Sequence, residues 1–145
     1  SDFAIRKIKR SVVGESIEGA HPSLKKMAGT IEEGVAQLAN RVEEVLRKHG
    51  KEVFLRQFAQ KRLADIAIDL FALSAVLART TALVGERGGT DKCELEMKLA
   101  EGFLVKAKRR LAKNFDQMTN NDDELRKEVA ESIAEVGYYP VAPIS

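Results

Sequence analysis

The chain has 145 residues, of which 44% are hydrophobic and 32% charged, a composition typical of one globular domain and not of a disordered segment. Its formal net charge of +2 does not favour nucleic acid as a partner. The single cysteine, Cys93, cannot form an internal disulfide, and two histidines offer little to a transition metal. The sequence shows neither a signal-peptide pattern nor a run of about 18 apolar residues that would predict a membrane span. It does not begin with methionine, so we expect a fragment or a processed chain.

Residues 1–22 are predicted to form a short amphipathic segment followed by a linker. Apolar and basic side chains are mixed in the first part, and glycines and a proline follow in the second. A short helix of this kind can place cations at lipid headgroups and apolar side chains below them. A solvated helix, or one covered by a partner, explains the pattern at least as well. The candidate membrane-surface residues are Phe3, Ile5, Arg6, Lys7, Ile8, Lys9 and Arg10.

Residues 23–137 are predicted to form four α-helices. Apolar residues recur at steps of three and four from Pro22 to Gly50, and again from about Lys51 to Val84. A third helix follows a turn near residues 86–89, and a fourth runs up to Gly137. Short connections between four helices favour an all-α, up-and-down four-helix bundle. Residues 138–145 are predicted to be an extended tail.

Two capping boxes are predicted at helix starts. Asp91 lies three residues before Glu94 at the start of the third helix, and Asn121 lies three residues before Glu124 at the start of the fourth. Each acceptor side chain should therefore bind a free backbone N–H of the first helical turn.

The second helix has an unusually apolar middle. Between Ile66 and Ala78 only Asp69 and Ser74 are polar, so apolar side chains surround the helix instead of forming one stripe. Such a helix must be covered on several sides. Thirteen residues that include an aspartate are too few to span a bilayer, so we expect protein to supply the cover.

Asp65 and Asp69 lie one turn apart on this apolar helix, where an unpaired carboxylate would cost several kcal/mol. They could be a pair of catalytic acids. The favoured interpretation is structural ion pairing with Arg62, with Arg79 or with basic residues of another helix.

Other chemistry has weak support in the sequence. A di-iron site in a helical bundle needs two Glu-x-x-His pairs, and only Glu18 with His21 fits that spacing. No histidine lies near Cys93 in the sequence to activate it as a nucleophile. Residues 88–90, Gly-Gly-Thr, lack the strand and the Lys-Ser/Thr of a phosphate loop. The basic residues between 106 and 113 lack exposed aromatic neighbours and are interpreted as a solvated face.

The segment Gln57 to Arg79, QFAQKRLADIAIDLFALSAVLAR, resembles the central helix of the C-terminal helical region of very-long-chain-type acyl-CoA dehydrogenases. His21-Pro22-Ser23-Leu24 is similar to the start of that region's first helix. The resemblance covers roughly residues 20–137 and is most specific in the second helix. The matching positions are Gln57, Arg62, Leu63, Ala64, Asp65, Ala67, Ile68, Asp69, Leu70, Val76, Leu77 and Arg79.

The resemblance implies a parent enzyme that binds FAD, oxidises a fatty acyl-CoA to the trans-2-enoyl-CoA and passes electrons to an electron-transfer flavoprotein. It implies a homodimer that is mitochondrial in a eukaryote, and cytoplasmic or peripheral to a membrane in a bacterium. The family's Tyr-Glu-Gly-Thr-like catalytic motif does not occur here. We therefore assign no catalytic, FAD-binding or metal-binding residue to this chain. It is expected to act as an inactive accessory module that packs on upstream catalytic domains and contributes to membrane association. The alternative is a free-standing adaptor or dimerisation bundle.

Overall fold

The computed structural model describes residues 17–138, which contain four α-helices and no strand. The predicted all-α fold is therefore confirmed. Three short 3₁₀ turns join or precede the helices. The elements in chain order are η1 (Pro22–Leu24), α2 (Lys25–His49), η2 (Gly50–Leu55), α3 (Gln57–Arg87), η3 (Thr90–Lys92), α4 (Glu94–Gln117) and α5 (Asp123–Val136).

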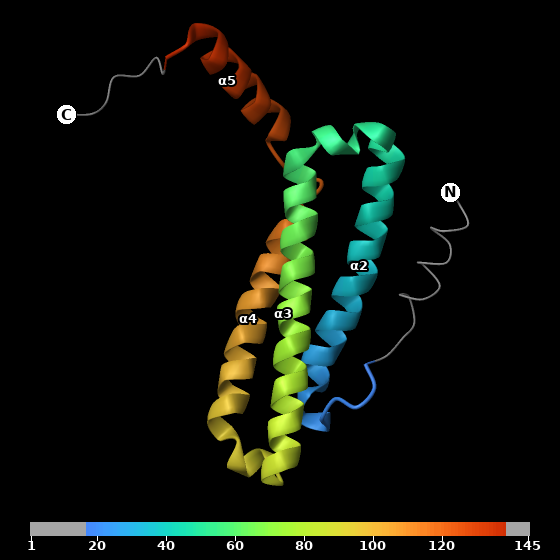
Figure 1. Ribbon diagram of the computed structural model, residues 1–145, viewed down its shortest axis with the longest axis vertical. Helices are drawn as coiled ribbons and strands as arrows, with labels where there is room; N and C mark the ends of the chain where they lie inside the picture. Colours follow the sequence, from blue (N-terminus) through green and yellow to red (C-terminus); the bar gives the residue numbers. More distant parts are fainter. Residues whose placement is uncertain (1–16, 139–145) are drawn as a thin grey trace, which may run out of the picture.

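Helices α2, α3 and α4 run up and down beside one another, and α3 lies between the other two (Figure 1). Each tight connection reverses the chain direction at a glycine with positive φ, Gly50 at 52° and Gly88 at 78°. A residue with a Cβ rarely adopts such backbone angles, which explains why these helices end where they do.

The hydrophobic core follows one face of each of these three helices. In α3 the fully buried residues Ile66 and Leu73 lie at its centre. Helices α2 and α3 approach closely at Gly34, where a Cβ would lie 2.5 Å from Cδ2 of Leu70. The other buried members of the core are Leu24, Met27, Ala28, Ile31, Leu77, Ala100, Leu104, Ala107 and Leu111.

The fourth helix is present, but it does not pack along the other three. Helix α5 leaves the end of the bundle near η2 and points away from it (Figure 1), and none of its residues is buried. Leu125 and Val129 remain 60% and 49% exposed. The five residues between α4 and α5 permit this direction, and ion pairs at the start of α5 hold it there. The packed body of the structure is thus a three-helix bundle with an attached helical arm.

Helix boundaries differ from the predicted ones at three starts. The second helix begins at Gln57 instead of Lys51, because residues 50–55 form the 3₁₀ turn η2. The predicted Asp91–Glu94 capping box is wrong: α4 begins after a further 3₁₀ turn, and its N-cap is Cys93, with no side-chain cap. At α5 the Asn121 side chain accepts a hydrogen bond from the backbone N–H of Asp123 at 3.3 Å. This donor lies two residues after Asn121, whereas the predicted capping box uses the residue three positions later.

Helix α3 is long and apolar enough to meet a length-and-composition criterion for a membrane span, with an 18-residue window of mean hydropathy 1.7. The sequence had indicated no run of about 18 apolar residues that would predict a membrane span. The helix nevertheless carries core side chains and the buried polar residues Arg62, Asp69 and Thr80, which fit the centre of a protein bundle. We treat α3 as the core helix of this fold.

Residues 1–16 and 139–145 lie outside the described part of the chain. The predicted membrane-surface residues between Phe3 and Arg10 and most of the predicted tail therefore have no structural description. At the edge of the described region, the N–H of Ile17 donates to Glu32 at 2.7 Å and that of His21 to Thr81 at 3.3 Å. These bonds attach the last residues of the predicted linker to α2 and α3.

Candidate functional site: an apolar surface framed by ion pairs

Arg62 joins the central helix to the arm. Its Nη1 and Nη2 each donate to one carboxylate oxygen of Asp123 at 2.6 Å, with the two side chains only 11% and 20% exposed. These hydrogen bonds raise the pKa of Arg62 above its ordinary value, against the opposing effect of burial. A second, more exposed pair, Arg56 with Glu124 at 2.8 Å, lies beside it. Together they fix the first turn of α5 to the start of α3.

Asp69 pairs with Arg110 of α4. The Nε and Nη2 atoms of Arg110 donate to Asp69 at 2.6 to 3.0 Å, and the carboxylate is 10% exposed. The same guanidinium lies 5.8 Å from the ring centroid of Phe103, within cation–π range. The hydrogen bond to Asp69 raises the pKa of Arg110. Asp69 is therefore an ion-paired contact between α3 and α4.

The remaining two predicted ion-pair residues lie elsewhere. Asp65 accepts from Lys61 one turn away at 2.5 Å on the surface, a pairing that contributes little to stability. Arg79 is exposed and forms no ion pair with any residue between 17 and 138 in the structure. The structure thus does not bring Arg62, Asp65, Asp69 and Arg79 together into one site.

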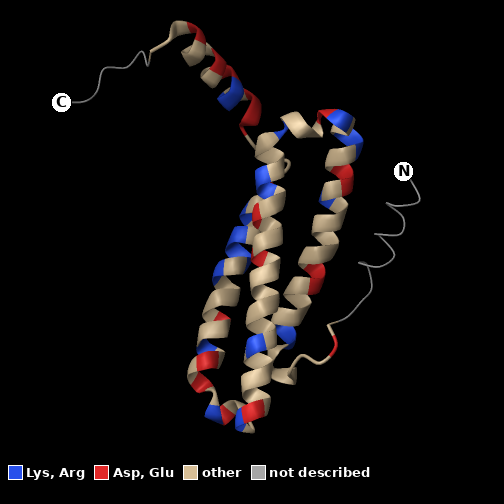
Figure 2. Cartoon of the chain, viewed as in Figure 1, with Lys and Arg blue, Asp and Glu red and all other residues tan. Residues whose placement is uncertain are grey.

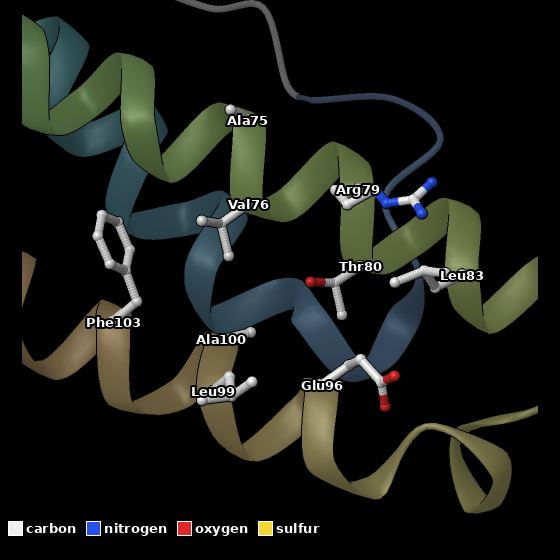
Figure 3. Close-up of a pocket in the computed structure, with 9 residues that line it drawn as sticks. All are labelled: Ala75, Val76, Arg79, Thr80, Leu83, Glu96, Leu99, Ala100 and Phe103. Carbon is white, nitrogen blue, oxygen red and sulfur yellow. The ribbon is translucent and has the colours of Figure 1, made fainter.

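Arg79 lies at the edge of an open groove between α3 and α4, with its guanidinium pointing away from α4 (Figure 3). The groove has a volume of about 550 Å³. Its lining is mostly aliphatic and aromatic: Ala75, Val76, Leu83, Leu99, Ala100 and Phe103, with Thr80 and Glu96. Glu96 is paired with Arg87 at 2.7 Å. Its pKa is lowered first by the hydrogen bond to its own backbone N–H and then by Arg87.

Beside the groove, the face of α3 that is turned away from the hydrophobic core is exposed and apolar. Ile68 and Phe71 are 64% and 78% exposed, and Leu99 across the groove on α4 is 64% exposed. Small exposed residues continue the stripe at Ala64, Ala75, Ala78 and Ala82. The groove, the stripe and Leu99 are together called the α3–α4 surface. A contiguous apolar area of this kind is characteristic of an interaction site.

The α3–α4 surface is mostly apolar, and the reactive groups singled out from the sequence are buried or paired in the described part of the chain. Among the described residues no group of three or more His, Cys, Asp or Glu side chains could hold a metal. Cys93 is fully buried, with its thiol 3.6 Å from the carbonyl of Leu83. Asp65 and Asp69 are separately paired with basic residues. The fold and this surface together define a helical domain with an uncovered apolar face.

The comparison with known families agrees with that class. The family described as "ACAD9/ACADV, C-terminal domain" matches residues 22–139. The chain is 32% identical over 112 residues to the very long-chain specific acyl-CoA dehydrogenase of Rattus norvegicus mitochondria, covering 77% of this chain and 17% of the relative. It is 34% identical over 99 residues to the Homo sapiens protein of the same name, and this match covers 68% of this chain and 15% of the relative.

The chain therefore belongs to the ACAD9/ACADV C-terminal domain family, which confirms the resemblance found in the sequence. It spans about one sixth of the length of the curated relatives it matches. The sequence did not reveal Arg110 as the partner of Asp69, nor which side of α3 stays uncovered. The all-round apolar composition of residues 66–78 was the available signal for that exposed side.

Proposed function

We propose that this chain is the C-terminal accessory and assembly module of a flavin-dependent acyl-CoA dehydrogenase, and that it performs no redox chemistry itself. The observation that carries the proposal is the α3–α4 surface, which leaves Phe71 78% exposed on the most apolar helix of a family member. A large apolar area of this kind is costly to leave in water. The occupant proposed for it is the catalytic body of the same polypeptide.

The parent enzyme is proposed to oxidise a fatty acyl-CoA to the trans-2-enoyl-CoA, as a homodimer that passes electrons to an electron-transfer flavoprotein. Mitochondrial relatives favour a mitochondrial location if the source is eukaryotic, and a cytoplasmic or membrane-peripheral one otherwise.

FAD would be held by the upstream domains. The α3–α4 groove does not fit a dinucleotide, because its lining is mainly aliphatic and aromatic and its acid, Glu96, is already paired. A pyrophosphate requires several converging backbone N–H groups or cations. Arg79 is the one cation that lines the groove among the described residues, and its guanidinium points away from α4 (Figure 3).

The test compares the parent enzyme with a variant carrying Phe71→Ser and Leu99→Ser. Because both side chains are exposed here, the isolated chain should keep its helicity and its urea midpoint. In the parent, the variant should release the module, which limited proteolysis would detect as rapid cleavage upstream of the bundle. A matched control, Leu125→Ser on the arm, alters a side chain of similar exposure and should leave cleavage slow. Equal cleavage rates in the parent and the Phe71/Leu99 variant would refute docking through this surface.

The same exposed face supports a second candidate, a free-standing dimerisation bundle in which a second copy covers the α3–α4 surface. Sedimentation of the isolated chain separates the two candidates. A monomer of 16.0 kDa at micromolar concentration argues against the dimerisation bundle. A dimer that Phe71→Ser dissociates supports it.

A further inference from the structure

Helix α5 has an apolar stripe that the described bundle leaves uncovered. Val129 and Val136 are 49% and 52% exposed, Ile133 lies between them in the sequence, and no residue of α5 is buried. These three residues follow one another at steps of four and three, so they form a stripe two turns long on one side of the helix. A helix of 14 residues is only marginally stable in water when nothing packs on it. A partner that covers the stripe would therefore stabilise α5.

Glutamates line one edge of this stripe. Residues 122–136 contain six acids and two cations, a net charge of −4, and Figure 2 shows more red than blue along α5. Four of the acids are already in ion pairs. The other two, Glu128 and Glu135, form no ion pair with any residue between 17 and 138 of the structure.

Glu128 and Glu135 lie seven residues apart, or about two helical turns, so they flank the stripe on the same side. The stripe and these two glutamates are together called the acidic arm face. A helix that binds this face must bring apolar side chains with cations beside them.

The complementary pattern occurs near the start of the sequence. Residues 3–13, called the basic segment, contain four cations and no acid, a net charge of +4. Within this segment Ile5, Ile8 and Val12 follow one another at steps of three and four. At helical spacing they form a stripe of two turns, the same length as the stripe of α5, with Lys9 at its edge. These residues lie outside the described part of the chain, so the pattern is that of their sequence.

We propose that the acidic arm face of α5 binds the basic segment of a second copy of this chain, and that the two copies exchange these elements reciprocally. The two apolar stripes pack together, and cations of the segment lie beside Glu128 and Glu135. Pairing of two α5 helices would instead bring a charge of −4 against a charge of −4. The proposal does not rest on the proposed function, because the acidic arm face and the α3–α4 surface share no residue.

The reach of the chain excludes the same copy as the source of the segment. The N–H of Ile17 donates to Glu32 at 2.7 Å, and Glu32 lies 17 residues before the end of α2 at His49, about 26 Å along the helix. Helix α5 leaves the bundle beyond that end (Figure 1). Val12 lies five residues before Ile17, so full extension carries it at most about 18 Å away. The stripe of the basic segment therefore cannot lie on the arm of its own chain.

Chemical crosslinking of the 145-residue chain tests which residues meet. Cys93 is the only cysteine of the chain and is fully buried, so an added surface thiol reacts alone. One chain carries Ile8→Cys, and a second, tagged chain carries Ile133→Cys. These are the middle residues of the two stripes, and they meet whether the helices run parallel or antiparallel. A short bis-maleimide should join the two chains.

The matched control replaces Ile133→Cys with Leu95→Cys, an exposed residue of α4, and should give little crosslinked product. Equal yields from the two pairs would overturn the proposal. A chain that carries both Ile8→Cys and Ile133→Cys is then diluted into an excess of the unsubstituted chain. Its crosslinking to other substituted chains should fall with the dilution. A crosslink within one chain that persists would overturn the assignment to a second copy.

Sedimentation equilibrium of charge-swapped chains gives the second readout. Arg6→Glu with Lys9→Glu should weaken self-association about tenfold or more, and so should Glu128→Lys with Glu135→Lys, because each pair of changes opposes like charges at the contact. In an equal mixture, the altered segment of one variant meets the altered arm of the other, and the remaining contact is unaltered. The mixture should therefore form heterodimers at least about tenfold more tightly than either variant forms homodimers.

A variant outside the contact separates this association from one through the α3–α4 surface. Phe71→Ser should self-associate like the unsubstituted chain. Three results would overturn the proposal: a mixture of the charge-swapped chains that stays monomeric, an unsubstituted chain that stays monomeric up to about 1 mM, or a dimer that Phe71→Ser dissociates.

Discussion

Replacing Asp123 with alanine should destabilise the bundle more than replacing its partner Arg62 with methionine. The two guanidinium nitrogens and two carboxylate oxygens of this pair are matched at 2.6 Å, and the Arg62 side chain is only 11% exposed. Asp123→Ala leaves that guanidinium buried without its counter-ion. We expect a loss of about 3 kcal/mol, which is typical of breaking a buried pair from one side.

Arg62→Met removes the charge and keeps an apolar side chain of similar length in the same position. Asp123, 20% exposed and in the first turn of α5, can regain water and is favoured there by the helix dipole. The expected loss is about 1 kcal/mol. The double variant should be more stable than Asp123→Ala alone, because no unpaired guanidinium remains. Urea unfolding followed by circular dichroism measures all three free energies. Single variants within about 0.5 kcal/mol of each other would refute the reasoning.

Three further predictions concern the core, the interhelical ion pair and pH. Leu73→Ala should cost about 3 to 4 kcal/mol in urea unfolding, because Leu73 is fully buried and its loss leaves a cavity; a cost under about 1 kcal/mol would contradict this packing. Asp69→Asn should cost about 1 to 2 kcal/mol, since its charge-assisted bonds from Arg110 become neutral ones, and this penalty should shrink in high salt. The pKa of Glu96 is lowered in the folded chain. Ionised Glu96 therefore stabilises the fold above the ordinary glutamate pKa, and this stabilisation is lost as pH falls through the folded-state pKa. An NMR titration should show a higher folded-state pKa for Glu96 in Arg87→Gln.

The sequence predicts the helices of this fold well, because their signals are local. Gly50 and Gly137 end helices at positive φ, as the apolar periodicity before them indicates. The first residues of the helices were predicted less well, since a 3₁₀ turn uses the same residue types as the first turn of an α-helix. Residues 50–55 illustrate this: no glycine or proline separates Lys51 from Gln57, so the apolar pattern runs on across the turn.

The candidate site was less predictable, because it depends on how the elements pack. The apolar stretch from Ile66 to Ala78 indicates that α3 needs cover on several sides, but not which side the chain itself leaves open. For Asp69 the sequence left Arg62, Arg79 and basic residues of another helix open as partners. The structure selects Arg110 of α4, 41 residues away. The direction of α5 is likewise set by Arg62 and Asp123, whose contact no sequence period reveals.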